Sequence, residues 1–374
     1  MKIKDVRAIP LMTYEESISG GPSLALVEVE TDEGLVGVGE ACAHSERGEA
    51  ALAVQNIVEK GFKPLLVGED PLDMGRLWNK LYDYCEWYGR AGIAIYALSA
   101  VDVALWDLVG KFFQVPVCKL LGGKYRDRAR VYASLLFDMD DPVATAAEGR
   151  EQVKHGFTAV KFGWGKRRDR AFGMNFKEDE KIVKTIREEL GPDVWLMVDV
   201  GRFVNLTPAE AIRLAKILEK YNIYWFEEPL PPDDVEGYKL LSDAVDVYVA
   251  AGESEYSLHG FLNYIQKRAI DIVQPDVTKT GGITMFRKIV DMCEIWNRMV
   301  VPHGFSSIVN VAANLQLVAS MPRVSLLEFR RTPSPLISKL AKNPPAYESG
   351  YLKIPTGPGL GLEIDYSIVE KYRL

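Results

Sequence analysis

Short apolar runs alternate with amphipathic helical segments from about residue 131 onward. An apolar run followed by a helix is typical of a βα unit, which recurs about every 30 residues. Eight such runs predict eight parallel strands closed into a barrel, with functional groups at the C-terminal ends of the strands. The runs are VYASLLF, AVKFGW, VWLMVDVG, YWFEEP, VYVAAGE, IVQPD, MVVPHGF and VSLLEF.

The first 120 residues follow two other patterns. Residues 3–11 and 24–41 alternate apolar and polar positions, and the turn at residues 31–34 makes the second stretch a β-hairpin. Residues 46–120 carry apolar positions at helical spacing instead. The pattern therefore predicts an α+β domain ahead of the barrel.

The fold class that follows is α/β, with three parts. We place an N-terminal α+β capping domain at residues 1–125 and a catalytic barrel at residues 126–335. Residues 336–374 are rich in glycine and proline and have a strand-like pattern, so we expect this segment to leave the barrel and return to the cap.

Polar side chains end most of the apolar runs. They are Lys161, Asp199, Glu227, Glu253, Asp276, His303 and Glu328. Because the C-terminal ends of barrel strands surround one mouth, we expect these groups to converge there. Lys161 raises a particular question, since a lysine at the tip of a buried strand costs free energy unless it has a partner or a task.

Three successive strands end in carboxylates, namely Asp199, Glu227 and Glu253. Three carboxylates within a few ångströms cannot all stay ionised unless positive charge lies between them. A cation with oxygen ligands satisfies this condition, and Mg²⁺ is our first choice. The alternative is that each carboxylate pairs with a lysine or arginine on a neighbouring strand. We expect the adjacent Glu228 to point away from the mouth into a structural ion pair.

Asp276 and His303 end adjacent strands. A carboxylate beside an imidazole fixes its tautomer and raises its basicity, so we predict an acid/base dyad. The other three histidines fall in predicted loops or on helix surfaces. Glu328 has two open interpretations: it hydrogen-bonds a substrate oxygen as an acid, or it only ends the last strand.

The order of these motifs resembles the enolase superfamily, in its mandelate racemase subgroup (the mandelate racemase/muconate lactonizing enzyme family). The motifs are Lys161 on the second strand, MVDVG, WFEEP, AAGESE, QPD…GG, PHG and LLEF. The resemblance covers nearly the whole chain. It implies a modified (β/α)7β TIM barrel capped by an α+β domain built from both termini.

The resemblance also implies a shared chemical step, the abstraction of a proton α to a carboxylate. An α-proton of this kind is too weakly acidic for histidine unless positive charge meets the enediolate that forms. The residues implied are a Mg²⁺ site at Asp199, Glu227 and Glu253, a His303–Asp276 dyad, and Glu328 beside the substrate carboxylate.

Two positions depart from the subgroup's pattern. The subgroup often has Lys-x-Lys on the second strand, but here Lys161 is followed two residues later by Gly163. Residues two apart share a strand face, so the missing lysine would have stood at Gly163. The subgroup also tends to have asparagine two residues after the first metal ligand, where this chain has Gly201.

The missing lysine favours dehydration. A racemase needs bases on both faces of one carbon, whereas a dehydratase needs one group to remove the α-proton and an acid for the departing β-hydroxyl. His303 can do both in a syn elimination. We therefore predict a Mg²⁺-dependent lyase that converts an aldonic or aldaric acid into a 2-keto-3-deoxy acid, with Lys161 as a cation near the substrate carboxylate.

Other interpretations stay open. Lys161 as a relocated second base would give a racemase, epimerase or cycloisomerase. A barrel that binds metal or a partner without turnover is a second alternative, and an aldolase-type metal barrel is a weaker one.

Substrate contacts are expected from a lid and a loop. Residues 11–23 lack apolar periodicity and contain two adjacent glycines, which is typical of a mobile lid over an active site. We assign Tyr14 and Ser19 to it as substrate contacts, with an ordinary surface loop as the alternative. Trp164 is expected to shape the far end of the pocket. Lys166 and Arg167 belong either to the pocket or to a solvated basic loop.

Composition narrows the class of partner. The chain has 374 residues, 48% of them hydrophobic, a net charge of −7 and a pI near 5.4. Because the net charge is negative, we expect neither nucleic acid nor membrane as partner. The resemblance implies a small carboxylate substrate. We also expect no apolar run of the roughly 18–20 residues that a membrane-spanning helix needs.

The four cysteines are scattered and we find no signal peptide, which favours a cytoplasmic protein. The resemblance implies a homo-oligomer, a dimer or an octamer.

Overall fold

A three-stranded antiparallel sheet forms the base of the capping domain. Its strands, in order, are β1 (Ile3–Met12), β2 (Ser23–Thr31) and β3 (Val36–Ala41). The computed structural model describes residues 1–13, 23–324, 326–330 and 334–374, together with all of their side chains except that of Arg202. The predicted lid contacts Tyr14 and Ser19 lie outside the described residues.

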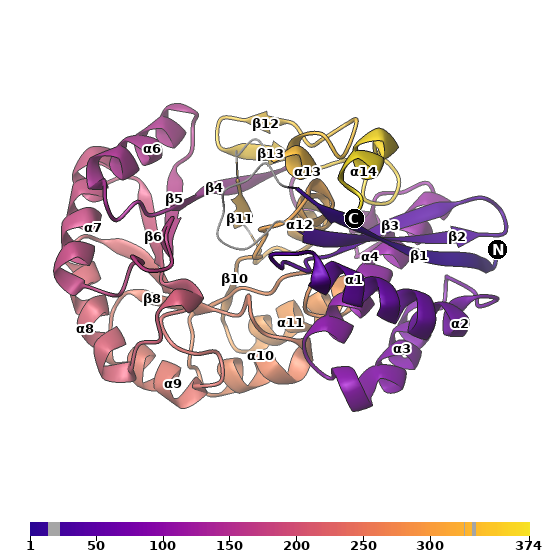
Figure 1. The fold of residues 1–374 in the computed structure, drawn as a ribbon, viewed down its shortest axis with the longest axis horizontal. Coiled ribbons are helices and arrows are strands. Elements are labelled where there is room, and N and C mark those ends of the chain that lie inside the picture. The colour runs from indigo at the N-terminus through magenta and orange to yellow at the C-terminus, as the bar shows by residue number, and fades with distance from the viewer. Residues whose placement is uncertain (14–22, 325, 331–333) are drawn as a thin grey trace.

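Helices cover this sheet and connect it to the barrel (Figure 1). They are α1 (Glu49–Asn56), the π-helical turn η1 (Ile57–Phe62), α2 (Lys63–Leu66), α3 (Met74–Gly89), α4 (Ile93–Phe112) and α5 (Val117–Leu120). Gly37 and Gly39 let α4 lie directly on β3, since a Cβ at either position would stand 2.1 or 2.0 Å from a carbonyl oxygen of α4. The alternating glycines of β3 thus serve helix–sheet packing.

Helix α4 corrects the expectation that no apolar run reaches membrane-spanning length. Among the described residues it is the one helix long and apolar enough to cross a membrane by length and composition. In the fold, 89% of its apolar window is buried between cap and barrel, so the structure accounts for its apolar character as a core helix.

Eight parallel strands form the barrel. They are β4 (Arg128–Leu136), β5 (Ala159–Gly163), β6 (Trp195–Asp199), β7 (Ile223–Glu227), β8 (Tyr248–Ala251), β9 (Ile272–Val273), β10 (Met299–Val300) and β11 (Leu326–Phe329). Neighbours pair in sequence order, β11 pairs with β4, and a parallel bridge between Val300 and Val324 closes the ring. All eight predicted strands are confirmed.

Seven helices alternate with these strands and form the outer layer seen in Figure 1. They are α6 (Pro142–Lys154), α7 (Phe176–Leu190), α8 (Pro208–Glu219), α9 (Val235–Ala244), α10 (Ser257–Gln266), α11 (Gly282–Ile295) and α12 (Ile308–Ser320). The arrangement is the (β/α)7β barrel that the resemblance implied, with the cap beside it.

An apolar layer fills the inside of the barrel below its mouth. Each strand, or the residue directly after it, contributes one buried side chain to this layer. They are Tyr132, Ala159, Met197, Trp225, Ala250, Ile272, Val301 and Leu326. Trp225 and Tyr132 pack edge to face at its centre, with ring centroids 5.3 Å apart. The layer closes the barrel interior, so a ligand can enter only from the mouth.

The C-terminal segment contacts both parts of the molecule. It contains α13 (Pro335–Ser338), β12 (Tyr347–Glu348), β13 (Tyr351–Lys353) and α14 (Tyr366–Tyr372), and β13 first pairs antiparallel with β4 of the barrel. The chain then returns to the cap, where Tyr366 donates a hydrogen bond to Glu28 and Leu374 N donates one to Pro10 O. Our expectation omitted the pairing with β4.

Candidate active site

The polar ring of the mouth follows from strand periodicity. Side chains recur on one face of a strand every two residues, so the position two beyond the apolar layer again points inward. These positions are Ser134, Lys161, Asp199, Glu227, His303 and Glu328. Glu253 and Asp276 follow the ends of β8 and β9. All seven side chains predicted from the strand ends are buried at this end of the barrel.

The three predicted metal ligands lie together. Asp199, Glu227 and Glu253 each offer a carboxylate oxygen, and these oxygens lie within 4.8 Å of one another. Burial, followed by the charge of Glu227, raises the pKa of Asp199 well above its usual range, and burial also raises the pKa of Glu227. Oxygen Oδ1 of Asp199 is buried without a hydrogen-bond partner. Crowded carboxylates with an unsatisfied oxygen fit a divalent cation.

Glu228 takes a different part. Its carboxylate accepts hydrogen bonds from Gly252 N at 3.4 Å and Ser254 Oγ at 3.1 Å. It therefore braces the segment after β8 and is absent from the metal-ligand cluster among the described residues. Its predicted ion pair stays a prediction.

Lys161 is an ion-pair centre. Its Nζ lies 2.6 Å from Glu227 Oε1, 3.3 Å from Glu328 Oε1 and 3.7 Å from Asp199 Oδ2. Burial would lower the pKa of Lys161, but Glu227 and Glu328 raise it well above the usual value. The lysine is thus a fixed positive charge between the metal ligands and Glu328, which answers the question that its buried position raised.

Asp276 and His303 are in contact, and their predicted acid/base role stays a prediction. His303 Nδ1 lies 2.7 Å from Asp276 Oδ2, while Asp276 Oδ1 accepts hydrogen bonds from Thr278 N and Oγ1 and from Asn310 Nδ2. Burial would raise the pKa of Asp276, but the hydrogen bond from His303 and the charge of Lys279 lower it to about 2. An ionised Asp276 keeps the proton on Nδ1 of His303 and leaves Nε2 for the cavity.

Nε2 of His303 lies among carboxylates. It is 3.2 Å from Glu253 Oε2 and 3.8 Å from Glu328 Oε2. Burial alone would lower the pKa of His303, but Glu253, the hydrogen bond to Asp276, and Glu328 raise it. Nε2 of His303 therefore stands beside the metal-ligand cluster.

Glu328 does more than end a strand. Its Oε2 accepts a hydrogen bond from Gly304 N at 3.0 Å, and its Oε1 faces Lys161. Burial would raise the pKa of Glu328, but Lys161 and then His303 lower it to about 2. The geometry supports Glu328 as an ionised carboxylate that orients Lys161. It does not favour the interpretation of Glu328 as a protonated acid.

The two departures from the subgroup pattern have one physical setting. Gly163 pairs in register with Asp199, and a Cβ there would lie 3.0 Å from Asp199 Oδ2. Gly201 has φ +62°, and a Cβ there would stand 1.9 Å from the indole of Trp164. Trp164 packs edge to face on Phe203 and lines the cavity. Gly201 therefore leaves room for the indole, whereas Gly163 leaves room beside the carboxylate of Asp199, the first metal ligand.

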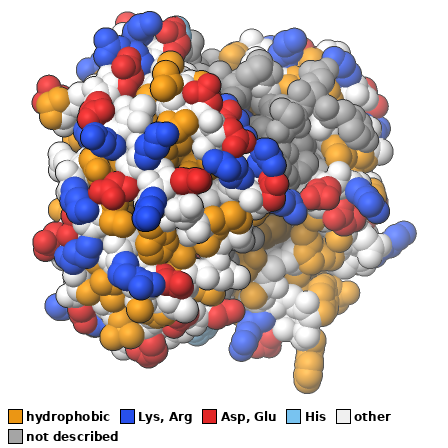
Figure 2. Space-filling model, turned by 60° about the vertical axis from the view of Figure 1, so that its left-hand side comes forward, with side chains coloured by type: hydrophobic (Ala, Val, Ile, Leu, Met, Phe, Trp, Pro, Cys, Tyr) orange, Lys and Arg blue, Asp and Glu red, His pale blue; other side chains and the backbone are white. Residues whose placement is uncertain are grey.

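The basic loop after Trp164 turns away from the site. Lys166 and Arg167 are exposed and form ion pairs with acidic neighbours, Lys166 with Asp138 and Arg167 with Asp140. Charged side chains of both signs are likewise interspersed over the face drawn in Figure 2. The solvated-loop alternative holds for both residues.

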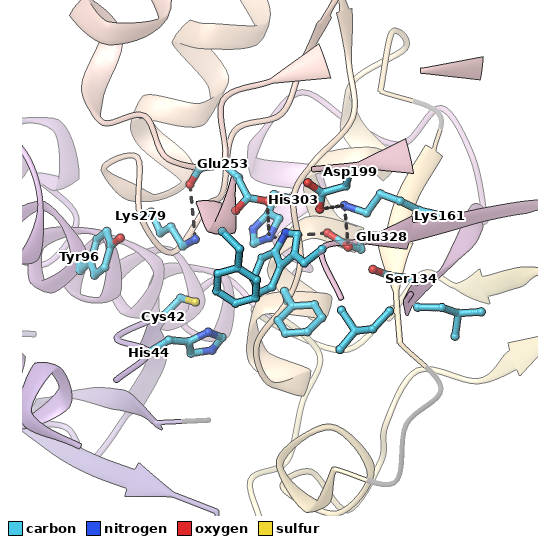
Figure 3. Close-up of a pocket in the computed structure, with 16 residues that line it drawn as sticks. Cys42, His44, Tyr96, Ser134, Lys161, Asp199, Glu253, Lys279, His303 and Glu328 are labelled. Carbon is cyan, nitrogen blue, oxygen red and sulfur yellow. Dashed lines mark hydrogen bonds and ion pairs between the residues drawn. The ribbon is translucent and has the colours of Figure 1, made fainter. Parts of the chain in front are cut away.

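A cavity of about 240 Å³ opens over the ring (Figure 3). Beside the predicted residues it is lined by Cys42, His44 and Tyr96 from the cap and by Lys279 from the loop after β9. Sequence reasoning missed these four. Only Lys279 carried a signal, three residues after Asp276, because the cap residues reach the mouth through the docking of two domains.

Comparisons with known proteins agree with this geometry. The profile of the "Mandelate racemase / muconate lactonizing enzyme, N-terminal domain" family matches residues 4–122, and that of the "Enolase C-terminal domain-like" family matches residues 144–368. The chain belongs to the enolase superfamily. It is an enzyme of the mandelate racemase/muconate lactonizing enzyme family, whose substrates are carboxylic acids.

Relatives carry more than one activity. D-galactarolactone cycloisomerase of Agrobacterium fabrum is 33% identical over 93% of this chain and 91% of its own. Arabinonate dehydratase of Saccharolobus solfataricus is 34% identical over 99% of both chains. The relatives of this chain therefore include both sugar-acid dehydratases and cycloisomerases, at nearly equal identity.

A solved structure bears on the metal. A racemase from Streptomyces coelicolor A3(2) with bound magnesium is 28% identical, with a TM-score of 0.88 over 100% of both chains. The buried carboxylate triad of this enolase-superfamily enzyme is typical of the superfamily's divalent metal site. The individual roles of the site residues stay predictions.

Proposed function

We propose that this enzyme dehydrates an aldonic or aldaric acid to a 2-keto-3-deoxy acid, with Mg²⁺ held by Asp199, Glu227 and Glu253. The observation that carries the proposal is one ring nitrogen, Nε2 of the buried His303, which lies at the cavity beside the metal-ligand cluster, with no lysine at position 163 to act from the other face. Relatives that are sugar-acid dehydratases support the substrate class.

Each residue has a part in this chemistry. Bound Mg²⁺ would supply positive charge to the substrate carboxylate as negative charge develops on it. Lys161 adds a fixed cation beside that carboxylate, and Glu328 holds the lysine in place. The apolar layer beneath excludes water from the barrel interior.

His303 handles both protons. Nε2 takes the proton from the α-carbon, and the electron pair of that C–H bond moves toward the carboxylate. The imidazolium then gives the proton to the β-hydroxyl, whose C–O bond breaks as water leaves. The enol that remains tautomerises to the 2-keto-3-deoxy acid. Asp276 stabilises the imidazolium between the two transfers.

A mass-spectrometric screen tests the proposal. The protein is incubated with Mg²⁺ in D₂O and a panel of aldonic and aldaric acids. We expect loss of water with deuterium beside the new keto group, and a fall of roughly 10²–10⁴-fold in rate for His303→Asn. Deuterium exchange at the α-carbon without loss of water would instead contradict dehydration, and inversion of configuration at that carbon would establish a second base.

Cycloisomerisation is the second candidate, because a cycloisomerase is among the relatives with similar identity. Lactone substrates in the same screen would reveal it as an isomeric keto acid that has lost no water and carries one deuterium from the solvent. A cytoplasmic location and a homo-oligomeric state remain predictions from the sequence.

A further inference from the structure

The cavity contains a second buried ammonium group that the proposed chemistry does not use. Lys279 lies in the loop after β9 and is only 6% exposed. Its Nζ is 3.4 Å from the carbonyl oxygen of Glu253 and 3.9 Å from Asp276 Oδ2. Among the described residues these are its hydrogen bond and its ion pair, and both are long for an ammonium with three donors.

The two lysines of the cavity differ in how well they are satisfied. Lys161 has three carboxylates within 3.7 Å, the nearest at 2.6 Å. Lys279 has one carboxylate at 3.9 Å, and that carboxylate also binds His303. Figure 3 shows the two lysines on opposite sides of the cavity, with His303 and Glu253 between them. Burial would lower the pKa of Lys279, and the charges of Asp276 and Glu253 both raise it, but among the described residues only Asp276 lies within ion-pair distance, at 3.9 Å. A buried cation without a close carboxylate is suited to a ligand anion.

The wall beside Lys279 comes from the cap and brings no negative charge. Burial raises the pKa of the Cys42 thiol to about 12, so the thiol stays neutral. The hydroxyl of Tyr96 lies 3.3 Å from that of Tyr256, and the ring of His44 faces the same space. Uncharged donors and acceptors around one cation fit a carboxylate that carries a neighbouring hydroxyl.

We propose that Lys279, with Cys42, His44 and Tyr96, binds a second carboxylate at the far end of the substrate, so that the enzyme prefers aldaric acids over aldonic acids. The inference rests on the proposed function for the reaction at the near end. One carboxylate would lie by the metal site and Lys161, and the other would reach Lys279. The terminal hydroxymethyl group of an aldonic acid would leave this second cation without an anion.

The unmodified enzyme provides the first test. Initial rates with Mg²⁺ are compared for acid pairs of matched configuration, galactarate with D-galactonate and D-glucarate with D-gluconate. We expect kcat/KM to favour the diacid of the productive pair by roughly 100-fold, since a buried charged group discriminates strongly against a ligand without its partner. An equal or greater kcat/KM for the aldonic acid would overturn the proposal.

A variant assigns the preference to the lysine. Lys279→Met should lower the diacid-to-monoacid ratio of kcat/KM toward unity, mainly through KM of the diacid, and Lys279→Arg should restore part of it. Lys288→Met removes an exposed lysine of α11 and should leave the ratio as it is. If Lys279 only supports Asp276, kcat falls equally for both substrates and the unchanged ratio contradicts the subsite.

Calorimetric titration separates the two proposals. Galactarate and D-galactonate are titrated into the Mg²⁺-loaded protein and into Lys279→Met. Tighter binding of galactarate that depends on Lys279, without product from any sugar acid, would refute dehydration and support the subsite. Product from aldonic acids alone would support dehydration and refute the subsite. If Lys279→Met does not fold, the comparison within the unmodified enzyme still decides.

Discussion

The ammonium group of Lys161 offsets part of the charge of three buried carboxylates. Without its ammonium, the carboxylates of Asp199, Glu227 and Glu328 would be buried side by side. We expect Lys161→Met to lower the free energy of unfolding of the metal-free protein by about 3–5 kcal/mol, the usual cost of breaking a buried ion pair. Chemical denaturation measures this, and the exposed Lys166→Met should change it by less than about 0.5 kcal/mol.

The same variant tests the role of the lysine in catalysis. If Lys161 is an electrostatic group, Lys161→Met lowers α-proton exchange for every substrate stereoisomer that the enzyme accepts. Deuterium exchange followed by mass spectrometry measures this. Loss of exchange for one enantiomer alone would make Lys161 the second base and would favour a racemase or epimerase.

Gly201 is a position where the family's asparagine should not fit. Gly201→Asn would place a Cβ 1.9 Å from the Trp164 indole. We expect a loss of about 1–3 kcal/mol in the free energy of unfolding from overpacking, and a higher KM because Trp164 lines the cavity.

A matched glycine provides the control for this substitution. Gly191 has φ +78°, and a Cβ added there would meet no atom within 4 Å, so Gly191→Asn carries the conformational cost without the clash. Thermal denaturation and steady-state kinetics compare the two variants. Equal stability and unchanged KM in both would show that Trp164 moves aside freely.

At the scale of elements, strand β3 of the cap is coupled to helix α12 of the barrel. The buried Glu40 accepts hydrogen bonds from Ser307 N and Oγ and from Asn310 N, at the N-terminus of α12. Asn310 in turn donates to Asp276 of the dyad. The cap therefore reaches the acid/base pair through one helix end.

This coupling predicts a split effect of Glu40→Ala. Unpaired donors at the end of α12 should lower the free energy of unfolding by about 1–3 kcal/mol. Because Asn310 orients Asp276, kcat should fall while KM stays close to its original value. Denaturation and kinetics test both parts, with Glu49→Ala as an exposed control in the cap. A loss of stability with unchanged kcat would make Glu40 structural only.

At the scale of the whole molecule, the features that could be predicted from the sequence are those that depend on strand periodicity. The eight barrel strands and the seven groups at their ends are all where the pattern placed them, since each lies two to four residues beyond an apolar layer. Cys42, His44 and Tyr96 escaped prediction because their place depends on how the cap docks. The pairing of β13 with β4 escaped prediction because a strand of three residues carries no register signal.

The contact between the two domains has its own chemistry. Asp102 of α4 is buried against the first turn of α11, where it accepts hydrogen bonds from Thr284 N at 2.9 Å and Thr284 Oγ1 at 2.5 Å. A Cβ at Gly282 would stand 2.3 Å from Asp102, and Trp78 of the cap donates to Gly281 O. The paired glycines of the QPD…GG motif thus let the cap approach the barrel.

Asp102 makes the stability of this joint depend on pH. Burial raises its pKa from 3.8 to about 7, so between these values the folded protein holds a proton that the unfolded chain has lost. The contribution of Asp102 to stability is therefore largest below its unfolded pKa and is lost as pH rises through about 7, at no more than about 1.4 kcal/mol per pH unit.

Asp102→Asn removes this titration and keeps the shape of the side chain. The free energy of unfolding of Asp102→Asn relative to the original protein should then rise between about pH 4 and about pH 8. Denaturation across that range measures it, with the exposed Asp83→Asn as control. A constant difference would mean that Asp102 is already ionised at low pH in the folded protein, held so by its two donors from Thr284.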